Sequence, residues 1–353
     1  MLFRSCPDAA RRTGIHTVTV QHVNRRLVLS ERPDGVPTPS QFRRDDQPTE
    51  PLANGQFLVR SLFLSIDPAQ RGWVNASANY SDPVPIGGVM RSLAVGVIEE
   101  SRNVQFPVGL HLYGWFGWQD YCVATEKIVL SRVSATNGPL SAGLGVFGIT
   151  GITAYLALTE IGQPKSGETV LVSTAAGAVG SVVGQIARRL DCQVVGLTSA
   201  DNKTRQCVAE YGYDRALNYR TELTPERLRA ACPNGIDVFF DNTAGDIADS
   251  VWPLLNARAR VVQCGTASIA VWTPPPDGPR RERDVLTKRL RHEGFIIFDH
   301  VAKFAAVIEQ LAAWVKDGSL VYREDIEVGI DCAPAALQNL YRGENRGKKI
   351  IQL

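Results

Sequence analysis

Hydrophobic residues in the first part of the chain occur in short runs that are typical of β-strands. The clearest runs are 26–29, 56–64 and 94–98, and clusters of Pro, Gly and Asp separate them. From about residue 147 onward, short apolar runs alternate with stretches of helical periodicity. The runs expected to be strands are 170–172, 194–197, 238–240, 261–263 and 294–297. This alternation predicts an open parallel sheet that is covered by helices.

The change of pattern predicts an α/β protein with two domains, which agrees with the length of 353 residues. We expect a Rossmann-type, doubly wound parallel sheet domain over residues 147–309. A β-rich domain is expected over residues 21–146, and residues 310–353 are expected to return to it, because they end in another strand-like run. Residues 1–20 lack the continuous apolar core of a secretory signal, so we interpret them as an N-terminal extension.

Composition narrows the function to small-molecule chemistry. With 44% hydrophobic and 21% charged residues and a net charge of +2, the chain has the composition of a soluble globular protein, and nothing favours a nucleic acid or a membrane as partner. No run approaches the roughly 18 apolar residues of a membrane span. The seven cysteines are scattered and odd in number, which indicates a reducing, cytoplasmic compartment. Neither they nor the five histidines have the spacing of a metal site, so no metal is expected.

A turn of small residues follows the first expected strand of the parallel sheet. Gly177 and Gly180 lie between the strand at 170–172 and a helix expected from 181 to 190. Backbone N–H groups in such a turn can approach a pyrophosphate at the N-terminus of a helix, where the helix dipole favours negative charge. Ala175 occupies the place of the first glycine of the usual dinucleotide motif, so a tight turn without a ligand is an equally simple interpretation of the motif alone.

The residues after the next strand favour NADP over NAD. The strand at 193–197 arrives at the spacing of a βαβ unit, and an NAD site usually has an acidic residue at the end of this strand. This chain instead has Ser199 and Lys203, whose hydroxyl and ammonium groups suit a 2′-phosphate, whereas Asp201 comes too late for the ribose position. The alternative is that Lys203 and Arg205 are ordinary solvated residues at the start of a helix.

Two more polar turns follow expected strands. Residues 241–245 come directly after 238–240, and residues 264–268 come directly after 260–263. Ligands bind at the carboxyl edge of such sheets, so both turns are expected in the same crevice as the glycine turn. Gly265 would let the backbone approach a flat ring. Each turn by itself could equally be a plain connection between a strand and a helix.

Taken in order, these segments resemble the medium-chain dehydrogenase/reductase superfamily, and within it the zinc-independent branch of NADP-dependent double-bond reductases. This branch includes prostaglandin and leukotriene reductases, plant alkenal reductases and bacterial curcumin-type reductases. The resemblance covers about residues 22–353. The segments that carry it are 23–26, 64–68, 71–72, 117–121, 148–155, 174–180, 218–219, 240–242, 293–297 and 343–348. Zinc-binding members of the superfamily have a Cys/His pair near the start, whereas the segment after Leu64 contains no cysteine here.

The resemblance implies a GroES-like, β-rich catalytic domain that is built from the N-terminal and C-terminal segments and flanks the Rossmann domain. It also implies NADP(H) as cofactor, an active site between the domains, an enone or enal as small-molecule substrate and a homodimer. The residues implied at the cofactor are Thr150, Ala176, Gly177, Ala178, Val179, Gly180, Ser199, Lys203, Tyr219, Asn242, Cys264, Gly265, Thr266, Phe295, Ile296, Ile297 and Asn345. The resemblance implies that Gly177 through Gly180 hold the pyrophosphate and that Lys203 and Tyr219 hold the 2′-phosphate. It also implies that Asn242, Gly265 and Asn345 line the nicotinamide half.

In this family a hydride from NADPH adds to the β-carbon of the substrate, the developing enolate oxygen needs a hydrogen-bond donor, and the α-carbon takes a proton. The hydroxyl of Tyr80 could serve both needs, because residues 79–87 match the family's substrate-pocket tyrosine segment. Tyr80 is therefore the expected catalytic residue. The residues expected to line the substrate pocket are Ala69, Arg71, Tyr80 and Trp272.

Two departures from the family predict an altered pocket. Ala69 and Gln70 stand where relatives commonly have Tyr and Met, and residues 268–272 contain no tyrosine where relatives often have one. We therefore expect a wider or differently polar pocket and a substrate preference that is shifted away from short alkenals. A quinone reductase of the same superfamily and a cofactor-binding protein with little turnover are the alternatives.

Overall fold

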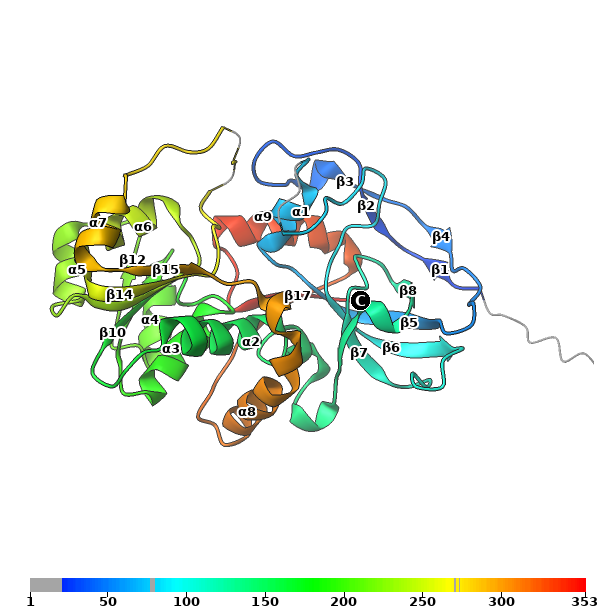
Figure 1. The fold of residues 1–353 in the computed structure, drawn as a ribbon. Helices are drawn as coiled ribbons and strands as arrows, with labels where there is room; N and C mark the ends of the chain where they lie inside the picture. Colours follow the sequence, from blue (N-terminus) through cyan, green and yellow to red (C-terminus); the bar gives the residue numbers. More distant parts are fainter. Residues whose placement is uncertain (1–20, 77–79, 270, 273) are drawn as a thin grey trace, which may run out of the picture.

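Two sheets organise the chain, one parallel and one mainly antiparallel. The computed structural model describes residues 21–353 except 77–79, 270 and 273. Figure 1 shows the parallel sheet and its helices at the left and the antiparallel sheet at the right. The last helix and strand, in red, lie between them, so the C-terminal segment stands where the two parts meet.

The parallel sheet has six strands in the order β12-β11-β10-β13-β14-β15. In chain order they are β10 (Thr169–Ser173), β11 (Gln193–Thr198), β12 (Arg215–Asn218), β13 (Ile236–Asp241), β14 (Leu255–Gln263) and β15 (Arg291–Gly294). The central strands are apolar because both faces are covered: Val170 and Val172 belong to one hydrophobic core, and Leu171 belongs to another. The chain runs outward from β10 to β12 and then returns to β13, so β10 and β13 flank a topological switch point. The predicted doubly wound Rossmann-type sheet is confirmed.

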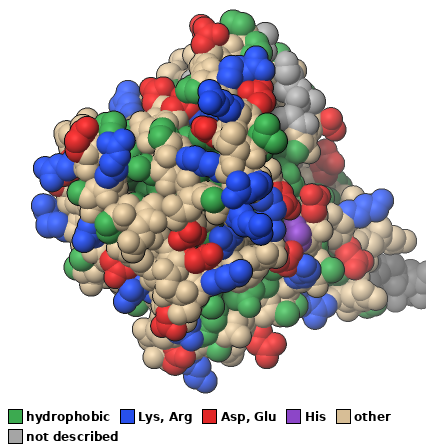
Figure 2. Space-filling view, turned by 60° about the vertical axis from the view of Figure 1, so that its left-hand side comes forward, with side chains coloured by type: hydrophobic (Ala, Val, Ile, Leu, Met, Phe, Trp, Pro, Cys, Tyr) green, Lys and Arg blue, Asp and Glu red, His purple; other side chains and the backbone are tan. Residues whose placement is uncertain are grey.

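Helices cover the two faces of this sheet in two groups. The group that packs with Val170 and Val172 consists of α2 (Ile149–Leu156), α3 (Gly180–Arg189), α4 (Asp201–Tyr211) and α8 (Phe304–Lys316). The group that packs with Leu171 consists of α5 (Pro225–Ala231), α6 (Gly245–Val251) and α7 (Glu282–Lys288). The short helical turns between them are η5 (Ala157–Gly162), η6 (Trp252–Leu254) and η7 (Ile297–Lys303). Figure 2 shows the surface of this side of the molecule, where acidic and basic side chains are interspersed.

The antiparallel sheet has seven strands, five from the N-terminal part of the chain and two from its C-terminal part. Its main path is β16-β17-β5-β6-β7-β9, and β8 pairs with β5. The strands are β5 (Phe57–Ser65), β6 (Ala94–Ser101), β7 (His111–Gly114), β8 (Tyr121–Ala124), β9 (Val129–Arg132), β16 (Glu324–Val328) and β17 (Lys348–Gln352). Because β17 pairs with β5, with Ile350 opposite Ser65, the C-terminal strand completes a sheet that the N-terminal segment began. This unit is the predicted β-rich, GroES-like domain.

Short elements complete the β-rich domain. They are β1 (Val23–Asn24) paired with β4 (Gln47–Pro48), β2 (Leu27–Leu29) paired with β3 (Phe42–Arg44), the helices α1 (Ala69–Val74) and α9 (Ala333–Arg342), and the turns η1 (Pro39–Gln41), η2 (Glu126–Ile128), η3 (Ala135–Asn137), η4 (Leu140–Leu144) and η8 (Ile330–Cys332). Helix α9 packs in the same hydrophobic core as β5, through Ala336 and Leu337. The N-terminal and C-terminal segments therefore share one core.

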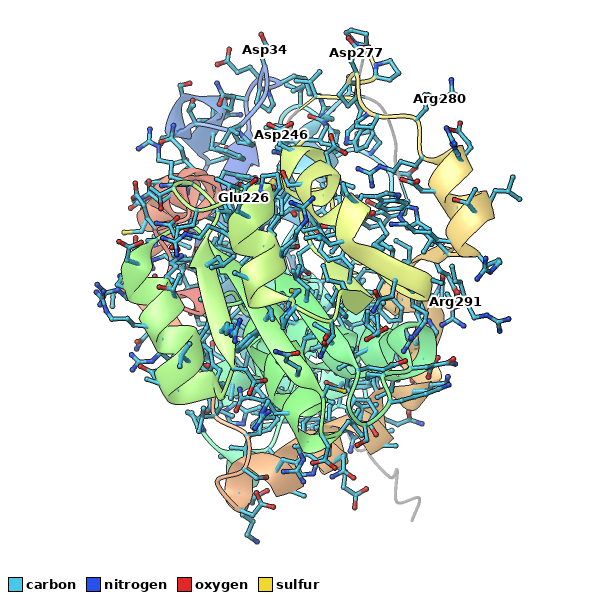
Figure 3. The ribbon with its side chains drawn as sticks, turned by 90° about the vertical axis from the view of Figure 1, so that its left-hand side faces the viewer. Asp34, Glu226, Asp246, Asp277, Arg280 and Arg291 are labelled. Carbon is cyan, nitrogen blue, oxygen red and sulfur yellow. The ribbon has the colours of Figure 1, made fainter. Side chains whose placement is uncertain are left out.

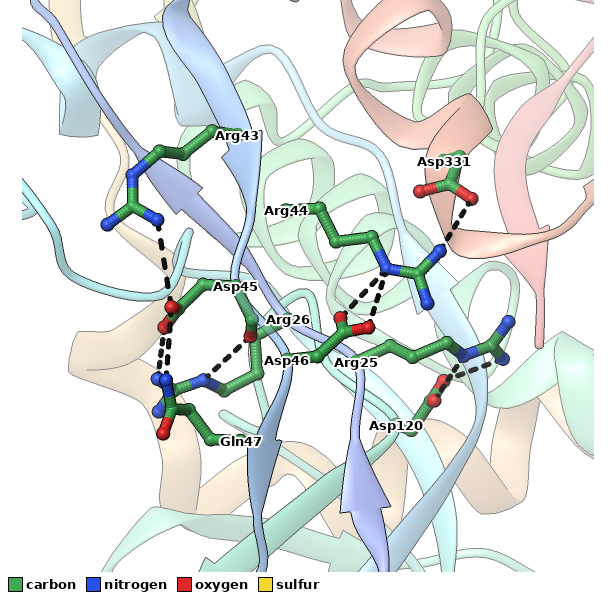
Figure 4. A network of polar contacts seen from close by, with 9 residues as sticks. All are labelled: Arg25, Arg26, Arg43, Arg44, Asp45, Asp46, Gln47, Asp120 and Asp331. Atoms are coloured by element: carbon green, nitrogen blue, oxygen red, sulfur yellow. Dashed lines mark hydrogen bonds and ion pairs between the residues drawn. The ribbon is translucent and has the colours of Figure 1, made fainter.

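Ion pairs attach the N-terminal strands β1 to β4 to the rest of this domain, as Figure 4 shows. Arg25 contacts Asp120, which precedes β8, at 2.5 Å. Arg44 contacts Asp46 at 2.8 Å and Asp331, just before α9, at 3.6 Å. The arginine side chains are partly exposed, so solvent screens these ion pairs and each contributes little to stability.

The structure corrects two expectations about the parallel sheet. Its last strand is Arg291–Gly294 instead of 294–297. The four residues of β15 are all exposed, so the strand joins the sheet through its backbone, while the apolar run that follows turns inward and buries Phe295 and Ile297. An additional strand, β12, lies at the opposite edge, and its sequence Arg-Ala-Leu-Asn is too polar to produce a strand signal.

The expected domain boundary between residues 309 and 310 also needs correction, because it would cut α8. Phe304, Val307 and Leu311 of this helix pack in the core of the parallel sheet. The chain enters the antiparallel sheet again only at Glu324, where β16 begins. Within the described residues, no helix is both long and apolar enough to cross a membrane.

Candidate active site

The glycine turn lies at the carboxyl end of β10. A Cβ at Gly180, the first residue of α3, would lie 2.4 Å from the carbonyl oxygen of Thr174, so only glycine fits there. Thr174 itself adopts a positive φ of 50° and turns the chain. Ala176 is buried, whereas Gly177, Ala178 and Val179 are partly exposed next to the N-terminus of α3. The turn thus presents backbone to solvent at the end of a helix where the dipole favours an anion.

The predicted 2′-phosphate residues meet the C-terminal end of α9. The ammonium group of Lys203 donates to the carbonyl oxygen of Gly343 at 2.8 Å, and the Ser199 hydroxyl donates to the same oxygen at 3.4 Å. Arg220, two residues after β12, donates to the carbonyl oxygen of Arg342 at 2.7 Å. Burial lowers the pKa of Lys203, and the charge of Arg220 lowers it further. Two cations and a hydroxyl therefore converge, which is a donor set that suits a phosphate.

The turns after β13 and β14 pack against each other. The carboxylate of Asp241 is buried and accepts hydrogen bonds from the backbone N–H and the hydroxyl of Thr243, at 2.8 Å and 2.9 Å. The Asn242 side chain donates to the carbonyl oxygen of Ser173 at 2.8 Å, which links the turn to β10. A Cβ at Gly265 would lie 2.8 Å from the Asn242 carbonyl oxygen, so a glycine is needed for this close approach. The two polar turns and the glycine turn meet at one edge of the sheet.

The remaining predicted cofactor residues surround this edge. Burial raises the pKa of Cys264 to about 12, and the negative charge of Asp241 adds to the shift. Phe295 and Ile297 are buried, whereas Ile296 between them is 36% exposed. Three more of these residues donate hydrogen bonds to backbone carbonyl oxygens, each at 2.8 Å. The Thr150 hydroxyl donates to Gly145, the Tyr219 N–H donates to Thr198, and the Asn345 side-chain amide donates to Gly347. Gly347 forms an isolated bridge with Gly177, so the loop that carries Asn345 lies beside the glycine turn.

Tyr80, the predicted catalytic residue, belongs to the β-rich domain. Its side chain is 50% exposed, and burial of the rest of it raises its pKa. The N–H of Val84 donates to the carbonyl oxygen of Trp73 in α1 at 2.8 Å, so the segment that begins with Tyr80 packs on this helix. Arg71 of the same helix contacts the turn after β14, so this segment lies close to a contact between the domains.

Arg71, one of the residues predicted to bind substrate, instead joins the two domains. Its buried guanidinium donates to the carbonyl oxygens of Thr266, Ala267 and Ile269, all in the segment after β14. The guanidinium also lies over the ring of Tyr341 in α9, 4.5 Å from the ring centroid. Through three hydrogen bonds and this ring contact, the Arg71 side chain holds the turn that contains Thr266 against the β-rich domain.

The other two residues predicted for the substrate pocket lie on the same two walls. Ala69 is partly buried in α1 and packs against the core of the β-rich domain. Trp272 follows the segment that Arg71 holds, and 51% of its surface is exposed.

Comparisons with known proteins agree with this geometry. A family model of the N-terminal domain of oxidoreductases matches residues 25–133, and a model of zinc-binding dehydrogenases matches residues 178–313. The chain is 39% identical to the NADPH-dependent curcumin reductase of Escherichia coli K12, over 94% of this chain and 97% of the relative. It is 32% identical to the NADP(+)-dependent 2-alkenal reductase of Nicotiana tabacum, over 94% and 97% of the two chains.

A solved structure covers both domains. The complex of CurA from Vibrio vulnificus with NADPH matches with a TM-score of 0.87 and 37% identity, over 93% of this chain and 98% of that chain. The chain belongs to the medium-chain dehydrogenase/reductase superfamily, in its double-bond reductase branch.

This member of the double-bond reductase branch accommodates an alanine at the first glycine position of the motif through a second glycine. A Cβ at Gly196, in β11, would lie 2.7 Å from the Cβ of Ala175. The methyl group of Ala175 is fully buried, so it fits only because Gly196 has no side chain. The missing first glycine is therefore compensated within the neighbouring strand.

Sequence reasoning missed three contributors to this reductase site. Arg220 follows a strand that was not predicted, and Tyr341 is one of several apolar or aromatic residues in α9, so neither had a distinguishing signal. Lys348 forms a buried ion pair with Asp67 at 2.6 Å and donates to the Ile66 carbonyl at 2.9 Å. This pair fastens β17 to the end of β5, close to the meeting point of the domains. Its partners are 281 residues apart in sequence, so only the fold brings them together.

Among the described residues, no group of three or more His, Cys, Asp or Glu side chains is arranged to hold a metal ion. The carboxylate of Asp67, which follows β5 in this reductase, has Lys348 as its partner. The Ser65 hydroxyl donates to the second oxygen of the same carboxylate. The side chain at this position therefore forms part of a structural contact between strands.

Proposed function

We propose that this chain is an NADPH-dependent reductase of the activated carbon–carbon double bond of enones and enals. The observation that supports the proposal is that the segment of Tyr80 packs on α1, through the Val84 N–H to the Trp73 carbonyl oxygen, while Arg71 of the same helix contacts the turn after β14. The names of the curcumin and alkenal reductase relatives point to the same class of reaction. Within this class we propose a substrate preference shifted away from short alkenals, because Ala69 stands where relatives commonly have Tyr and residues 268–272 contain no tyrosine.

The residues at the sheet edge fit NADPH in two respects. Gly177 is partly exposed beside the N-terminus of α3, where a pyrophosphate would lie, and Lys203, Ser199 and Arg220 form a donor set for the 2′-phosphate. When bound, NADPH would supply the hydride for the β-carbon of the substrate.

Tyr80 would then serve the other end of the double bond. A hydrogen bond from its hydroxyl to the carbonyl oxygen would stabilise the negative charge that develops there. The same hydroxyl would give its proton to the α-carbon and recover one from water, so that one hydride and one proton are added. Because burial raises the pKa of Tyr80, the hydroxyl stays protonated at neutral pH and is ready to donate.

The test follows NADPH oxidation with a panel of enals, enones and quinones, with NADH in parallel. Turnover of enones and enals with a preference for NADPH is expected. Replacing Tyr80 by Phe is expected to lower kcat with enones about 100-fold, since a general acid contributes at least that much, and to change quinone reduction little. Tyr121, in β8, stacks on His22. Tyr121→Phe is the matched control and should leave kcat with enones unchanged.

The same panel separates the two alternatives. Turnover of quinones alone, unaffected by Tyr80→Phe, would indicate a quinone reductase. Absence of turnover with every acceptor, together with tight NADPH binding, would indicate a cofactor-binding protein.

We further propose that two copies associate through β15. This strand ends the parallel sheet, its residues are exposed, and Figure 3 shows Arg291 at the margin of the molecule. An unpaired edge strand is a template for pairing with another strand. An antiparallel pairing centred on His292 would place Arg291 opposite Glu293 of the second copy. Light scattering should give a dimer that Arg291→Glu weakens and the exchanged pair Arg291→Glu with Glu293→Arg restores.

The six cysteines in the described part of the chain are free, and four of them are buried. We therefore propose a reducing, cytoplasmic environment for the protein. Loss of activity on secretion to an oxidising compartment, with restoration by a thiol reductant, would support this location.

A further inference from the structure

The wall that carries Tyr80 contains a buried hydrogen-bond donor with no acceptor. Trp73, in α1, is 2% exposed, and its indole nitrogen Nε1 has no hydrogen-bond partner in the structure. An unpaired buried donor costs about 1–3 kcal/mol, so native proteins rarely keep one without a use.

An unpaired indole by itself does not mark a site. Trp118 and Trp252 are also buried, and each has an indole nitrogen without a partner. Trp252 lies between Arg281 and His292 on the outer side of the parallel sheet, and Trp118 lies against Phe42 in the β-rich core. Neither has a catalytic candidate beside it among these ring contacts.

Trp73 differs because the segment that begins with Tyr80 is fixed onto it. The N–H of Val84 donates to the carbonyl oxygen of Trp73 at 2.8 Å. Arg91 lies over the Trp73 ring, 5.7 Å from its centroid, and donates to the carbonyl oxygen of Asp82 at 2.8 Å. The segment 80–84 is thus held against α1 from two sides, so Tyr80 begins a segment that packs directly on Trp73.

We propose that Trp73 is a positioning residue for Tyr80: its indole N–H donates to the phenolic oxygen of Tyr80 and directs the Tyr80 O–H toward the substrate oxygen. The proposal rests on the role of Tyr80 in the proposed function. It adds a residue that neither the motif segments nor the expected pocket residues contain.

The chemistry of the phenol explains the effect. A tyrosine hydroxyl has one proton and two lone pairs, so a donor on one lone pair limits the rotation of the O–H and leaves the proton free for a ligand. The same hydrogen bond favours the ionised phenol and opposes the effect of burial on the Tyr80 pKa. Hydrogen bonds in such a chain also polarise one another, which makes Tyr80 the better proton donor.

A double-mutant cycle tests the proposal. Trp73→Phe keeps an aromatic ring but removes the N–H, and it is expected to lower kcat with an enone about tenfold, which corresponds to the loss of one ordinary hydrogen bond. In the Tyr80→Phe background the same substitution is expected to have almost no effect, because Trp73 acts through the missing hydroxyl. A purely structural role of Trp73 would give losses that multiply.

Titration gives a second readout that does not depend on turnover. Carbon-13 labelling of the tyrosine ring reports the ionisation of Tyr80, and fluorotyrosine in its place brings the titration to lower pH. The pKa is expected to be higher in Trp73→Phe than in the wild type. Trp118→Phe and Trp252→Phe remove unpaired indoles of the same kind and are expected to leave both the titration and kcat unchanged.

Three results would overturn the proposal. They are losses of kcat that multiply when Trp73→Phe and Tyr80→Phe are combined, a Tyr80 titration that is unchanged in Trp73→Phe, or effects of Trp118→Phe or Trp252→Phe as large as those of Trp73→Phe. Failure of the proposed function is a separate outcome, because it would show as a wild type that oxidises NADPH with no enone or enal. The titration would still test the hydrogen bond between Trp73 and Tyr80 in that protein.

Discussion

The two halves of the site are built in different ways. The proposed cofactor half consists mainly of backbone at the carboxyl ends of β10, β13 and β14, and its geometry follows from the register of one sheet. The proposed substrate half consists of side chains such as Trp73 and Tyr80, which come from separate segments of the β-rich domain. The first half needs glycines at close approaches, and the second needs long-range contacts. The difference indicates that substitutions of these side chains can alter the substrate preference without weakening cofactor binding.

The adenosine end is the exception, since there the cofactor half depends on side chains from both domains. Lys203 and Arg220 of the parallel sheet domain donate to carbonyl oxygens of α9, which belongs to the β-rich core. A 2′-phosphate would compete for the same donors. Substitutions at the adenosine end therefore give the first test of the contrast between a cofactor half made of backbone and a substrate half made of side chains.

The largest expected effect belongs to Lys203→Met. Charge-assisted hydrogen bonds contribute about 1.5–3 kcal/mol, so affinity for 2′,5′-ADP is expected to fall about 10- to 100-fold, while affinity for 5′-AMP stays the same. Calorimetric titration with the two nucleotides measures the difference. Arg205→Met, at an exposed position of the same helix, is the control and should change neither. Equal weakening of both nucleotides would mean that Lys203 supports the fold instead of the phosphate.

The same contrast explains how much the sequence predicts. The Rossmann sheet follows from apolar runs such as 170–172, and the polar turns follow from their place after strands, because parallel strands end at one edge. Tyr80 required a resemblance to relatives, since nothing in its local pattern separates it from a loop tyrosine. Arg220, Tyr341 and the Lys348–Asp67 pair depend on contacts between distant segments. Local periodicity carries no information about such contacts.

The expectation for Arg71 shows the limit most clearly. Resemblance placed this residue in the substrate pocket, but its donors are used by the carbonyl oxygens of the turn after β14. A basic residue in a motif does not reveal whether its partner is a ligand or the backbone of another domain. The distinction requires the fold, because the partners are at least 195 residues away.

A smaller effect is expected from Arg71→Met, which would loosen the turn without removing a group from the chemistry. Misplacement by about 1 Å can cost up to about 100-fold in rate, and the neighbouring contacts of this turn should limit the loss in kcat to about tenfold. Binding of 2′,5′-ADP should be unchanged, because the adenosine end lies elsewhere. The primary deuterium isotope effect with deuterated NADPH should rise as hydride transfer becomes slower.

Arg132→Met is the matched control for this prediction. Arg132 also lies over an aromatic ring, that of Phe106 at 5.9 Å, and donates to the Gln105 carbonyl oxygen at 3.0 Å. It is exposed on β9, and both of these partners belong to the β-rich domain. A loss of rate in this variant equal to that in Arg71→Met, or an unchanged isotope effect in the latter, would refute the positioning role of Arg71.

The smallest expected effect concerns Glu324 in β16, a polar group of the β-rich domain that has an incomplete set of partners. One carboxylate oxygen accepts from the Ser141 hydroxyl at 2.9 Å, and the other is buried without a partner. Burial raises the pKa of Glu324 above its ordinary value. The folded state therefore holds this proton more tightly than the unfolded chain, so the contribution of Glu324 to stability is present at low pH and is lost as pH rises through the folded pKa.

Glu324→Gln removes this dependence. The variant is expected to be more stable than the wild type at neutral pH, by on the order of 1 kcal/mol or less because the side chain is only partly buried, and the gain should vanish below about pH 4. Urea unfolding at several pH values measures it. On the opposite face of the same strand, Glu327 pairs with Lys349 at 2.5 Å, so Glu327→Gln should give no gain at neutral pH. A Glu324→Gln variant less stable at pH 7 would show that the charged carboxylate is favourable where it lies.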